Sequence, residues 1–418
     1  MRIARLLGTV LGTTLLTTTA LLTTPAHAGI AAARDDVSLD GPALRDSLDA
    51  VHEAGMYGVF SSVRDGGERW TGASGLADVA TGRPVTPDMR QRVGSISKTF
   101  TAVGILQQVE RGRIRLDAPV GDYLPDLIPG ERGREITVRM LLNHTSGIGD
   151  YIAGAFPSLT RNSPASLEEE RFRSIRPAEL VRTGLAAPAT GRPGSVPGSY
   201  SNTNYVIAGL LLEKVTGQKA GPYLTRHVID RAGLRHTYLP RTPHIKGPHP
   251  RMYESWFGLL DPPRDFSVYD MSWASTAGSV VSTTDDLNRF YRALLGGKLV
   301  NKASLDEMTR TVPVSGVDYG LGIYSLELRG CGRFWGHDGA VFGAGTIALS
   351  SRDGKHQVAV AQNLMKYQEL DENGRPKQHP IDTAIAAHVV RALCADAPAS
   401  GINHSRLTKS LRFDQLSH

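Results

Sequence analysis

The chain has 418 residues, of which 40% are apolar and 21% charged, a composition typical of a globular protein. Its formal net charge of +6 is not concentrated in a block of Lys and Arg, which argues against a nucleic-acid partner. The 13 histidines and two cysteines show no metal-ligand spacing, so we expect no metal and no cofactor.

The N-terminus has the pattern of a secretory signal peptide. Arg2 and Arg5 precede an uncharged apolar run over 6–22, and Ala26-His27-Ala28 is a small-x-small cleavage site. The run is short and rich in threonine for a membrane span. We therefore predict a signal peptide over 1–28, a secreted protein, and no stable membrane span after cleavage.

The chain then begins with a helix and a hairpin. Asp40 is a candidate N-cap, with Pro42 in the first turn, and Gly55 ends the helix. Strands are expected over 57–63 and 68–74, on either side of an Asp-Gly-Gly turn.

Residues 91–284 are predicted to be mostly helical. Helices are expected over 95–111, 136–143 and 204–216. The segments 156–198 and 239–265, which are rich in proline, suggest surface loops.

After residue 284 the strand pattern returns. A helix capped by Thr283 is followed by strand candidates at 319–328, 333–336, 346–350 and 356–361, and by a helix at 381–394. These elements predict an α/β fold of the α+β type, in which both chain ends (about 40–90 and 285–395) build one antiparallel sheet. Terminal helices cover that sheet, an all-helical subdomain (about 91–284) is inserted, and residues 396–418 form a polar tail.

Ser95 and Lys98 lie three residues apart at the head of an apolar helix, so their side chains share a helix face. A serine hydroxyl is a poor nucleophile until a base removes its proton, and a lysine with a lowered pKa can be that base. The stretch is equally typical of an ordinary helix start, with Ser95 or Ser97 as the cap.

Two further elements can supply chemistry. Tyr200 precedes the apolar helix at 204–216, and a tyrosine hydroxyl near a lysine can relay protons. His337-Asp338-Gly339 is expected to end a strand, where the glycine would let backbone approach a ligand. Taken singly, Tyr200 is also explained as a core aromatic and 337–339 as a turn.

In order and spacing, the three elements together resemble the motifs of the penicillin-recognising serine hydrolases. These include β-lactamases of the AmpC type, secreted D-alanyl-D-alanine carboxypeptidases of actinomycetes, and related esterases and D-aminopeptidases. Ser95-x-x-Lys98 matches the first motif and Tyr200-x-Asn202 the second. His337-Asp338-Gly339 takes the place of the third, which is Lys-Thr-Gly in β-lactamases and His-Thr-Gly in the carboxypeptidases.

The connecting stretches 136–147 and 272–278 match the family as well, so the resemblance covers about residues 40–395. It implies a serine β-lactamase/transpeptidase-like fold, with a catalytic domain over 29–395.

The resemblance also implies a mechanism. Ser95 would attack a carbonyl to form an acyl-enzyme, and Lys98 and Tyr200 would move the proton, either of them being a candidate base. His337 would supply the polar or cationic contact that a lysine makes in β-lactamases. Asn202 and Trp273 would bind substrate, and the oxyanion would lie between the backbone N–H groups of Ser95 and Ala340.

Three positions depart from the carboxypeptidase pattern. The arginine and threonine that hold the terminal carboxylate of D-alanine are replaced by Tyr324 and Ala340. Asp338 replaces the threonine of the third motif and would repel a carboxylate-bearing substrate.

The nearest resemblance is to a D-alanyl-D-alanine carboxypeptidase of the penicillin-binding type. An esterase, a β-lactamase or a D-aminopeptidase is the alternative among enzymes, and a non-hydrolysing protein that binds cell-wall fragments is the alternative of another class. The expected partner is a small molecule or a peptidoglycan peptide, and β-lactams are further candidates.

Cys331 and Cys394 are the two cysteines. Because an even number of cysteines in an exported protein favours pairing, we predict a disulfide between them rather than two buried thiols.

Overall fold

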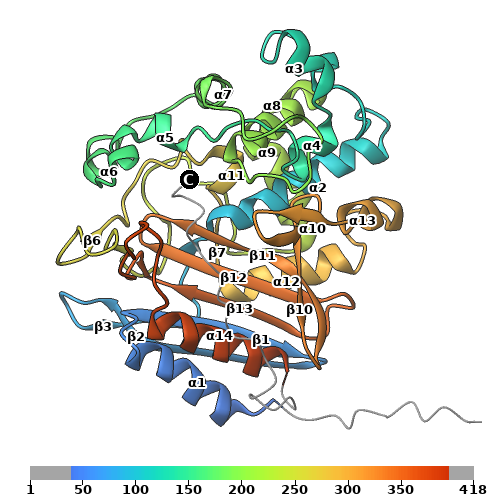
Figure 1. The fold of residues 1–418 in the computed structure, drawn as a ribbon. Coiled ribbons are helices and arrows are strands. Elements are labelled where there is room, and N and C mark those ends of the chain that lie inside the picture. Colours follow the sequence, from blue (N-terminus) through green and yellow to red (C-terminus); the bar gives the residue numbers. More distant parts are fainter. Residues whose placement is uncertain (1–38, 395–418) are drawn as a thin grey trace, which may run out of the picture. The chain divides into compact units, whose positions relative to one another are not determined.

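The computed structural model describes residues 39–394. The predicted signal peptide (1–28) and polar tail (396–418) lie outside these residues. Within them, both ends of the chain form an antiparallel sheet, and the segment between them forms a set of helices (Figure 1).

The sheet has nine strands in the order β3-β2-β1-β13-β12-β11-β10-β9-β8, all paired antiparallel. Its members are β1 (Gly58–Asp65), β2 (Glu68–Asp78), β3 (Arg83–Pro84), β8 (Val312–Val314), β9 (Val317–Tyr319), β10 (Tyr324–Leu328), β11 (Gly332–Val341), β12 (Ala344–Ser351) and β13 (Gln357–Gln362). The pairing of β1 with β13 joins the two ends of the chain, with Val59 opposite Gln362. This topology confirms the predicted antiparallel sheet built from both ends.

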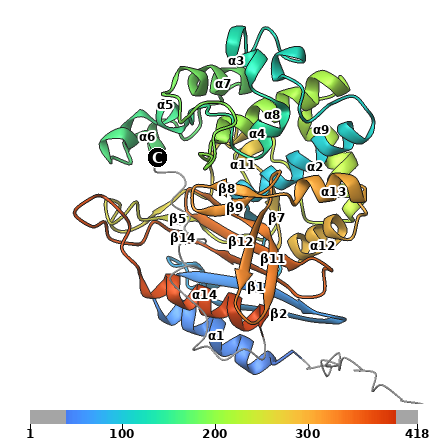
Figure 2. The same ribbon diagram turned by 45° about the vertical axis from the view of Figure 1, so that its right-hand side comes forward.

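Two terminal helices cover one face of this sheet, and both views show them side by side (Figures 1 and 2). They are α1 (Gly41–Glu53) and α14 (Pro380–Leu393). Their apolar stripes, including Leu48 and Val389, are buried in one core with the sheet. As predicted, Asp40 caps α1, because its Oδ1 accepts a hydrogen bond of 3.0 Å from the Ala43 backbone N–H.

The inserted helices form a second core against the opposite face. The helices between β3 and β8 are α2 (Ser97–Glu110), α3 (Gly130–Glu135), α4 (Val138–Leu142), α5 (Ile152–Ala155), α6 (Ala165–Glu169), α7 (Pro177–Ala186), α8 (Asn202–Thr216), α9 (Ala220–Leu224), α10 (Asp230–Ala232), α11 (Ser275–Gly278), α12 (Thr284–Leu295) and α13 (Lys302–Met308). The 3-10 turns are η1 (Gly94–Ile96), η2 (Val120–Asp122) and η3 (Pro157–Arg161), and η4 (Thr225–Ile229) is a π-turn.

Short strands also occur among these helices, so the insertion is not purely helical. They are β4 (Gln91–Arg92), which pairs with β7 (Val281–Ser282), and β5 (Tyr253–Glu254), which lies between β6 (Arg264–Asp265) and β14 (Leu364–Met365). The prediction of loops alone at 239–265 therefore missed β5 and β6.

The prediction of a surface loop over 156–198 was wrong in part. The segment contains α7, which begins with Pro177 and buries Leu180 and Val181. Gly184 lets α7 approach α8 closely, since a Cβ there would lie 2.5 Å from Cγ2 of Thr203. The proline- and glycine-rich flanks hide this short amphipathic helix in the sequence.

Two strand predictions also need correction. The single strand expected over 319–328 is two strands, β9 and β10, separated by a tight turn in which Gly322 has φ of +75°. The strand expected over 333–336 is longer, because β11 remains paired with β12 up to Val341, and the third motif lies in its last residues, as expected.

Cys331 and Cys394 are bonded to each other, which is the predicted pairing. The disulfide joins the turn before β11 to the end of α14. Among the described residues, no helix is long and apolar enough to cross a membrane.

Candidate active site

Ser95 lies in η1, directly before α2, and Lys98 lies in the first turn of α2. The Lys98 Nζ is 2.8 Å from the Ser95 Oγ. Neither Ser95 nor Ser97 caps the helix through its side chain. Instead, the Ser97 hydroxyl donates to the Gly94 carbonyl and accepts from the Val280 backbone N–H. The pair therefore has the geometry of a nucleophile and its base.

Lys98 is fully buried and has three neighbours within hydrogen-bond distance. Besides the Ser95 Oγ, its Nζ lies 2.8 Å from the Asn202 Oδ1 and 3.0 Å from the Ala277 carbonyl oxygen. Burial lowers the pKa of Lys98 to about 7, although the carboxylates of Asp150 and Asp338 oppose this shift. The amine is therefore partly neutral near pH 7.

Asp150 fixes the orientation of Asn202. Its Oδ2 accepts hydrogen bonds from the Asn202 backbone N–H (2.8 Å) and the Asn202 side-chain Nδ2 (2.7 Å). The amide nitrogen therefore faces Asp150, and the amide oxygen faces Lys98. Burial raises the pKa of Asp150, and the hydrogen bonds from Asn202 and Ile152 oppose that shift.

Tyr200 lies between Lys98 and a histidine ring. The Lys98 Nζ is 4.8 Å from the centroid of the Tyr200 ring, and the His144 ring packs at 4.1 Å on that ring. Burial raises the pKa of Tyr200 well above its ordinary value, and the neighbouring Ser95 hydroxyl opposes the shift. The phenol is therefore protonated at neutral pH.

His337 and Asp338 project to opposite sides of β11, as adjacent residues of a strand do. The His337 Nδ1 donates to the Asp338 carbonyl oxygen, and its Nε2 lies 2.8 Å from the Tyr319 hydroxyl. Burial and the nearby Lys98 lower the pKa of His337 to about 3. The ring is thus neutral and does not line the pocket, which corrects the expectation of a cationic contact.

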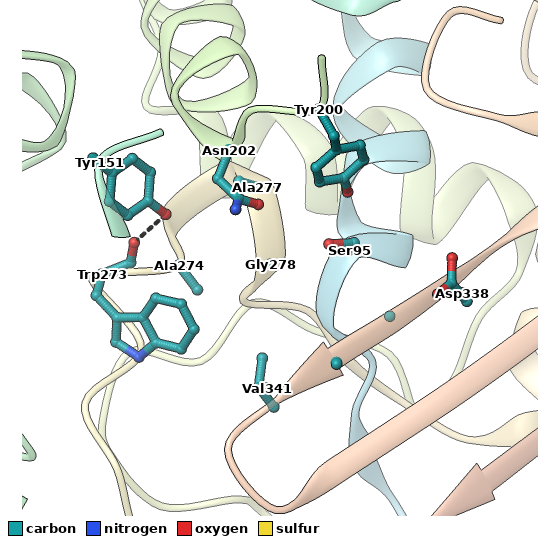
Figure 3. A pocket seen from close by; sticks show the side chains of 12 residues that line it. Ser95, Tyr151, Tyr200, Asn202, Trp273, Ala274, Ala277, Gly278, Asp338 and Val341 are labelled. Atoms are coloured by element: carbon teal, nitrogen blue, oxygen red, sulfur yellow. Dashed lines mark hydrogen bonds between the residues drawn. The ribbon is translucent and has the colours of Figure 1, made fainter. Parts of the chain in front are cut away.

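The pocket beside Ser95 is lined by residues of all three motifs (Figure 3). The lining residues are Ser95, Tyr151, Tyr200, Asn202, Trp273, Ala274, Ala277, Gly278, Asp338, Gly339, Ala340 and Val341. Asp338 brings a carboxyl group into this lining, and none of the lining residues within 39–394 is a lysine, arginine or histidine. Tyr324, at the position of the carboxylate-binding arginine, is buried outside the lining.

The other end of the pocket is aromatic. Tyr151 donates a 2.5 Å hydrogen bond to the Trp273 carbonyl (Figure 3). The Trp273 ring also stacks on Phe342, with the ring centroids 4.9 Å apart. Ser95 lies between this aromatic end and Asp338 (Figure 3).

Backbone N–H groups of η1 and β11 approach each other closely at two glycines. A Cβ at Gly94 would lie 2.5 Å from the Ala340 N, and one at Gly339 would lie 2.6 Å from the Ser95 N. The absence of side chains at these positions lets the two amides lie near one point, which suits an oxyanion.

The sequence-predicted site residues are thus brought together, except that His337 lies behind the pocket. Asp150, Tyr151 and His144 were not predicted as site residues. The available signal was proximity in sequence, because His144 lies within the predicted family landmark 136–147, and Asp150 and Tyr151 come a few residues after it. Across residues 39–394, no cluster of three or more His, Cys, Asp or Glu side chains could hold a metal ion.

The sequence pattern of the β-lactamase family matches residues 44–380. The chain therefore belongs to this family, and it is a serine hydrolase. A solved structure of a D-stereospecific amidohydrolase from Streptomyces is 36% identical, with a TM-score of 0.74, over 86% of this chain and 100% of that one.

Two curated relatives are more distant. Penicillin-binding protein 4* of Bacillus subtilis is 27% identical over 76% of this chain and 74% of its own length. A D-aminopeptidase of Cereibacter sphaeroides is 26% identical over 78% of this chain and 61% of its own length.

Proposed function

We propose that this protein is an exported serine amidohydrolase that forms an acyl-enzyme on Ser95, from amides or esters that carry no free carboxylate near the scissile bond. The observation that carries the substrate class is the pocket lining, where the described part of the chain presents the carboxyl group of Asp338 and no cationic side chain. Export rests on the signal-like sequence of residues 1–28.

Lys98 is the base in this proposal. A neutral amine has two N–H donors and one lone pair. The Ala277 carbonyl and the Asn202 Oδ1 can only accept hydrogen bonds, so they take the two N–H groups. The lone pair is left for the third neighbour, the Ser95 hydroxyl at 2.8 Å, which can donate.

Tyr200 acts as a proton donor rather than a base. Because its phenol is protonated at neutral pH, it can pass a proton to the leaving group and recover one through Lys98. The backbone N–H groups of Ser95 and Ala340 would stabilise the oxyanion, a contribution of typically about 3–4 kcal/mol.

A D-alanyl-D-alanine carboxypeptidase, the nearest resemblance of the sequence, must bind a terminal carboxylate. Asp338 would repel that group, and the buried Tyr324 offers no compensating charge. An uncharged or amine-bearing substrate fits better, with its apolar group against Trp273. The 36% identity to a protein named as a D-stereospecific amidohydrolase supports amides of D-amino acids as the first candidates.

Peptidoglycan peptides and β-lactams remain candidate ligands under this proposal. Both carry a carboxylate, so we expect them to acylate Ser95 slowly.

Four matched substrates test the substrate class: D-phenylalanine amide, L-phenylalanine amide, a D-Ala-D-Ala peptide with a free carboxylate, and the methyl ester of that peptide. We expect turnover of the D-amide, weak turnover of the L-amide, and faster cleavage of the peptide methyl ester than of the free acid. Faster cleavage of the free acid would overturn the proposed specificity. Absence of both turnover and fluorophosphonate labelling would instead favour a non-hydrolysing binding protein.

A further inference from the structure

A second hollow, of about 330 Å³, lies in the segment between α10 and β5 and shares no residue with the catalytic pocket. We call it the basic groove, after its charged and histidine side chains. These are Arg90, Arg235, His236, Arg241, His244 and Lys246. No Asp or Glu is among its described lining residues.

The cations of the basic groove are not neutralised by neighbours. Within residues 39–394, none of Arg90, Arg235, Arg241 and Lys246 forms an ion pair. Elsewhere, arginines such as Arg139 are paired with carboxylates. The nearby carboxylate of Asp286 is buried, and its Oδ2 accepts hydrogen bonds from the His236 backbone N–H and the Thr237 hydroxyl.

The groove is also held in shape. The Arg90 guanidinium donates to the Lys246 carbonyl at 2.5 Å and lies 3.0 Å from the His236 Nδ1. The Tyr238 hydroxyl accepts from the Lys246 backbone N–H at 2.6 Å, and Tyr238 exchanges two backbone hydrogen bonds with Val281. Such fixing lowers the entropy that a ligand must remove on binding.

We propose that the basic groove binds consecutive phosphate groups of an anionic polymer without bases, such as a polyphosphate or polyol-phosphate chain. Guanidinium groups suit phosphate because their donors match its oxygens in pairs. Four positive charges in one hollow call for several negative charges, which a single phosphate does not supply.

The surroundings favour a chain over a single anion. Residues 239–242 line both the groove and a larger cavity of about 760 Å³ that residues of α11 also line, so the two hollows adjoin each other. That cavity adds the cation of Arg226, whereas its Lys219 is paired with Glu213 at 3.1 Å, and Asp270 also lines it. Among the groove's described lining residues, Tyr238 is the single tyrosine, tryptophan or phenylalanine, and stacking of nucleic-acid bases normally uses several such rings.

Calorimetric titration of the purified full chain at low salt tests the proposal. The probes are linear inorganic polyphosphate, orthophosphate at the same total phosphate, and a single-stranded oligonucleotide of matched charge. The test variant is Arg235→Gln/Arg241→Gln, since both side chains are exposed and form no hydrogen bond within residues 39–394. The control is Arg113→Gln/Arg182→Gln, which removes the same charge from exposed arginines outside the groove.

We expect polyphosphate to bind wild type and control alike, to bind the test variant at least about tenfold more weakly, and to weaken as salt rises. Hydrolysis of a neutral ester by all three proteins verifies folding. Equal losses of polyphosphate affinity in the test and control variants would show that binding depends on net charge alone, and would overturn the proposal. Equally tight binding of the oligonucleotide, or of orthophosphate, would replace the proposed ligand by nucleic acid or by a single anion.

Discussion

One carboxylate oxygen of Asp150 binds both the backbone N–H and the side-chain amide of Asn202, at 2.8 and 2.7 Å. This relationship sets the direction of the Asn202 amide, and thereby the direction of the Lys98 lone pair. It also places a buried negative charge where it raises the pKa of Lys98.

Replacement of Asp150 by asparagine should therefore change the pH profile as well as the rate. In wild type, the deprotonation of Lys98, with a pKa of about 7, should make kcat/KM for a neutral ester rise with pH and level off above pH 7. Loss of the Asp150 charge removes a stabiliser of the protonated amine, so the rising limb in Asp150→Asn should move to lower pH.

The plateau rate of Asp150→Asn should also fall, because the Asn202 amide is no longer fixed. The exposed Asp230, on α10, gives a matched control in Asp230→Asn, which should keep the wild-type profile. If the rising limb of the pH profile stays in place or moves to higher pH in Asp150→Asn, the Asp150 carboxylate does not raise the pKa of Lys98.

Tyr200→Phe should lower kcat by about 10²–10⁴-fold, the usual contribution of a positioned proton donor. Because Tyr200 and Lys98 serve one proton path, the double variant with Lys98→Ala should lose little more than either single variant. Steady-state kinetics measure this coupling, and Tyr57→Phe, outside the pocket, is the control. Losses that multiply in the double variant would argue for independent roles.

Asp338→Asn should relax the discrimination against carboxylates. We expect the ratio of free-acid to methyl-ester cleavage to rise about tenfold or more, because a like charge beside the substrate is removed. Competition assays with the two D-Ala-D-Ala substrates measure the ratio. If the ratio is unchanged, Asp338 does not face the carboxylate of the bound peptide.

The disulfide should stabilise the fold without serving the chemistry. Cys331 and Cys394 are 63 residues apart, and closing such a loop contributes roughly 4 kcal/mol on the loop-entropy model. Urea unfolding of Cys331→Ser/Cys394→Ser should show a loss of this order, with ester turnover retained under native conditions. Equal free energies of unfolding for the variant and the oxidised wild type would refute this role.

Features that depend on neighbours in the chain could be predicted from the sequence. Ser95 and Lys98 meet because they share a helix face, and the Asp40 cap is a local hydrogen bond. The antiparallel sheet followed from strand patterns at both chain ends.

Features set by distant contacts could not be predicted in the same way. Asp150 follows a glycine in what looks like a loop, and its partner Asn202 lies 52 residues away. The opposite roles of His337 and Asp338 depend on the pairing of β11, which directs the His337 side chain away from the pocket and the Asp338 side chain into its lining. The α7 helix gains its stability from packing on α8, which its proline- and glycine-rich flanks obscure.

Mass spectrometry of the protein after reaction with a fluorophosphonate ester shows whether Ser95 is the acyl-transfer nucleophile. We predict one covalent adduct per chain, on the peptide that contains Ser95, and no such adduct in a folded Ser95→Ala variant. The control Ser97→Ala should still be labelled, because the Ser97 hydroxyl bonds backbone groups rather than Lys98. An adduct on another residue, or undiminished labelling of Ser95→Ala, would contradict the account.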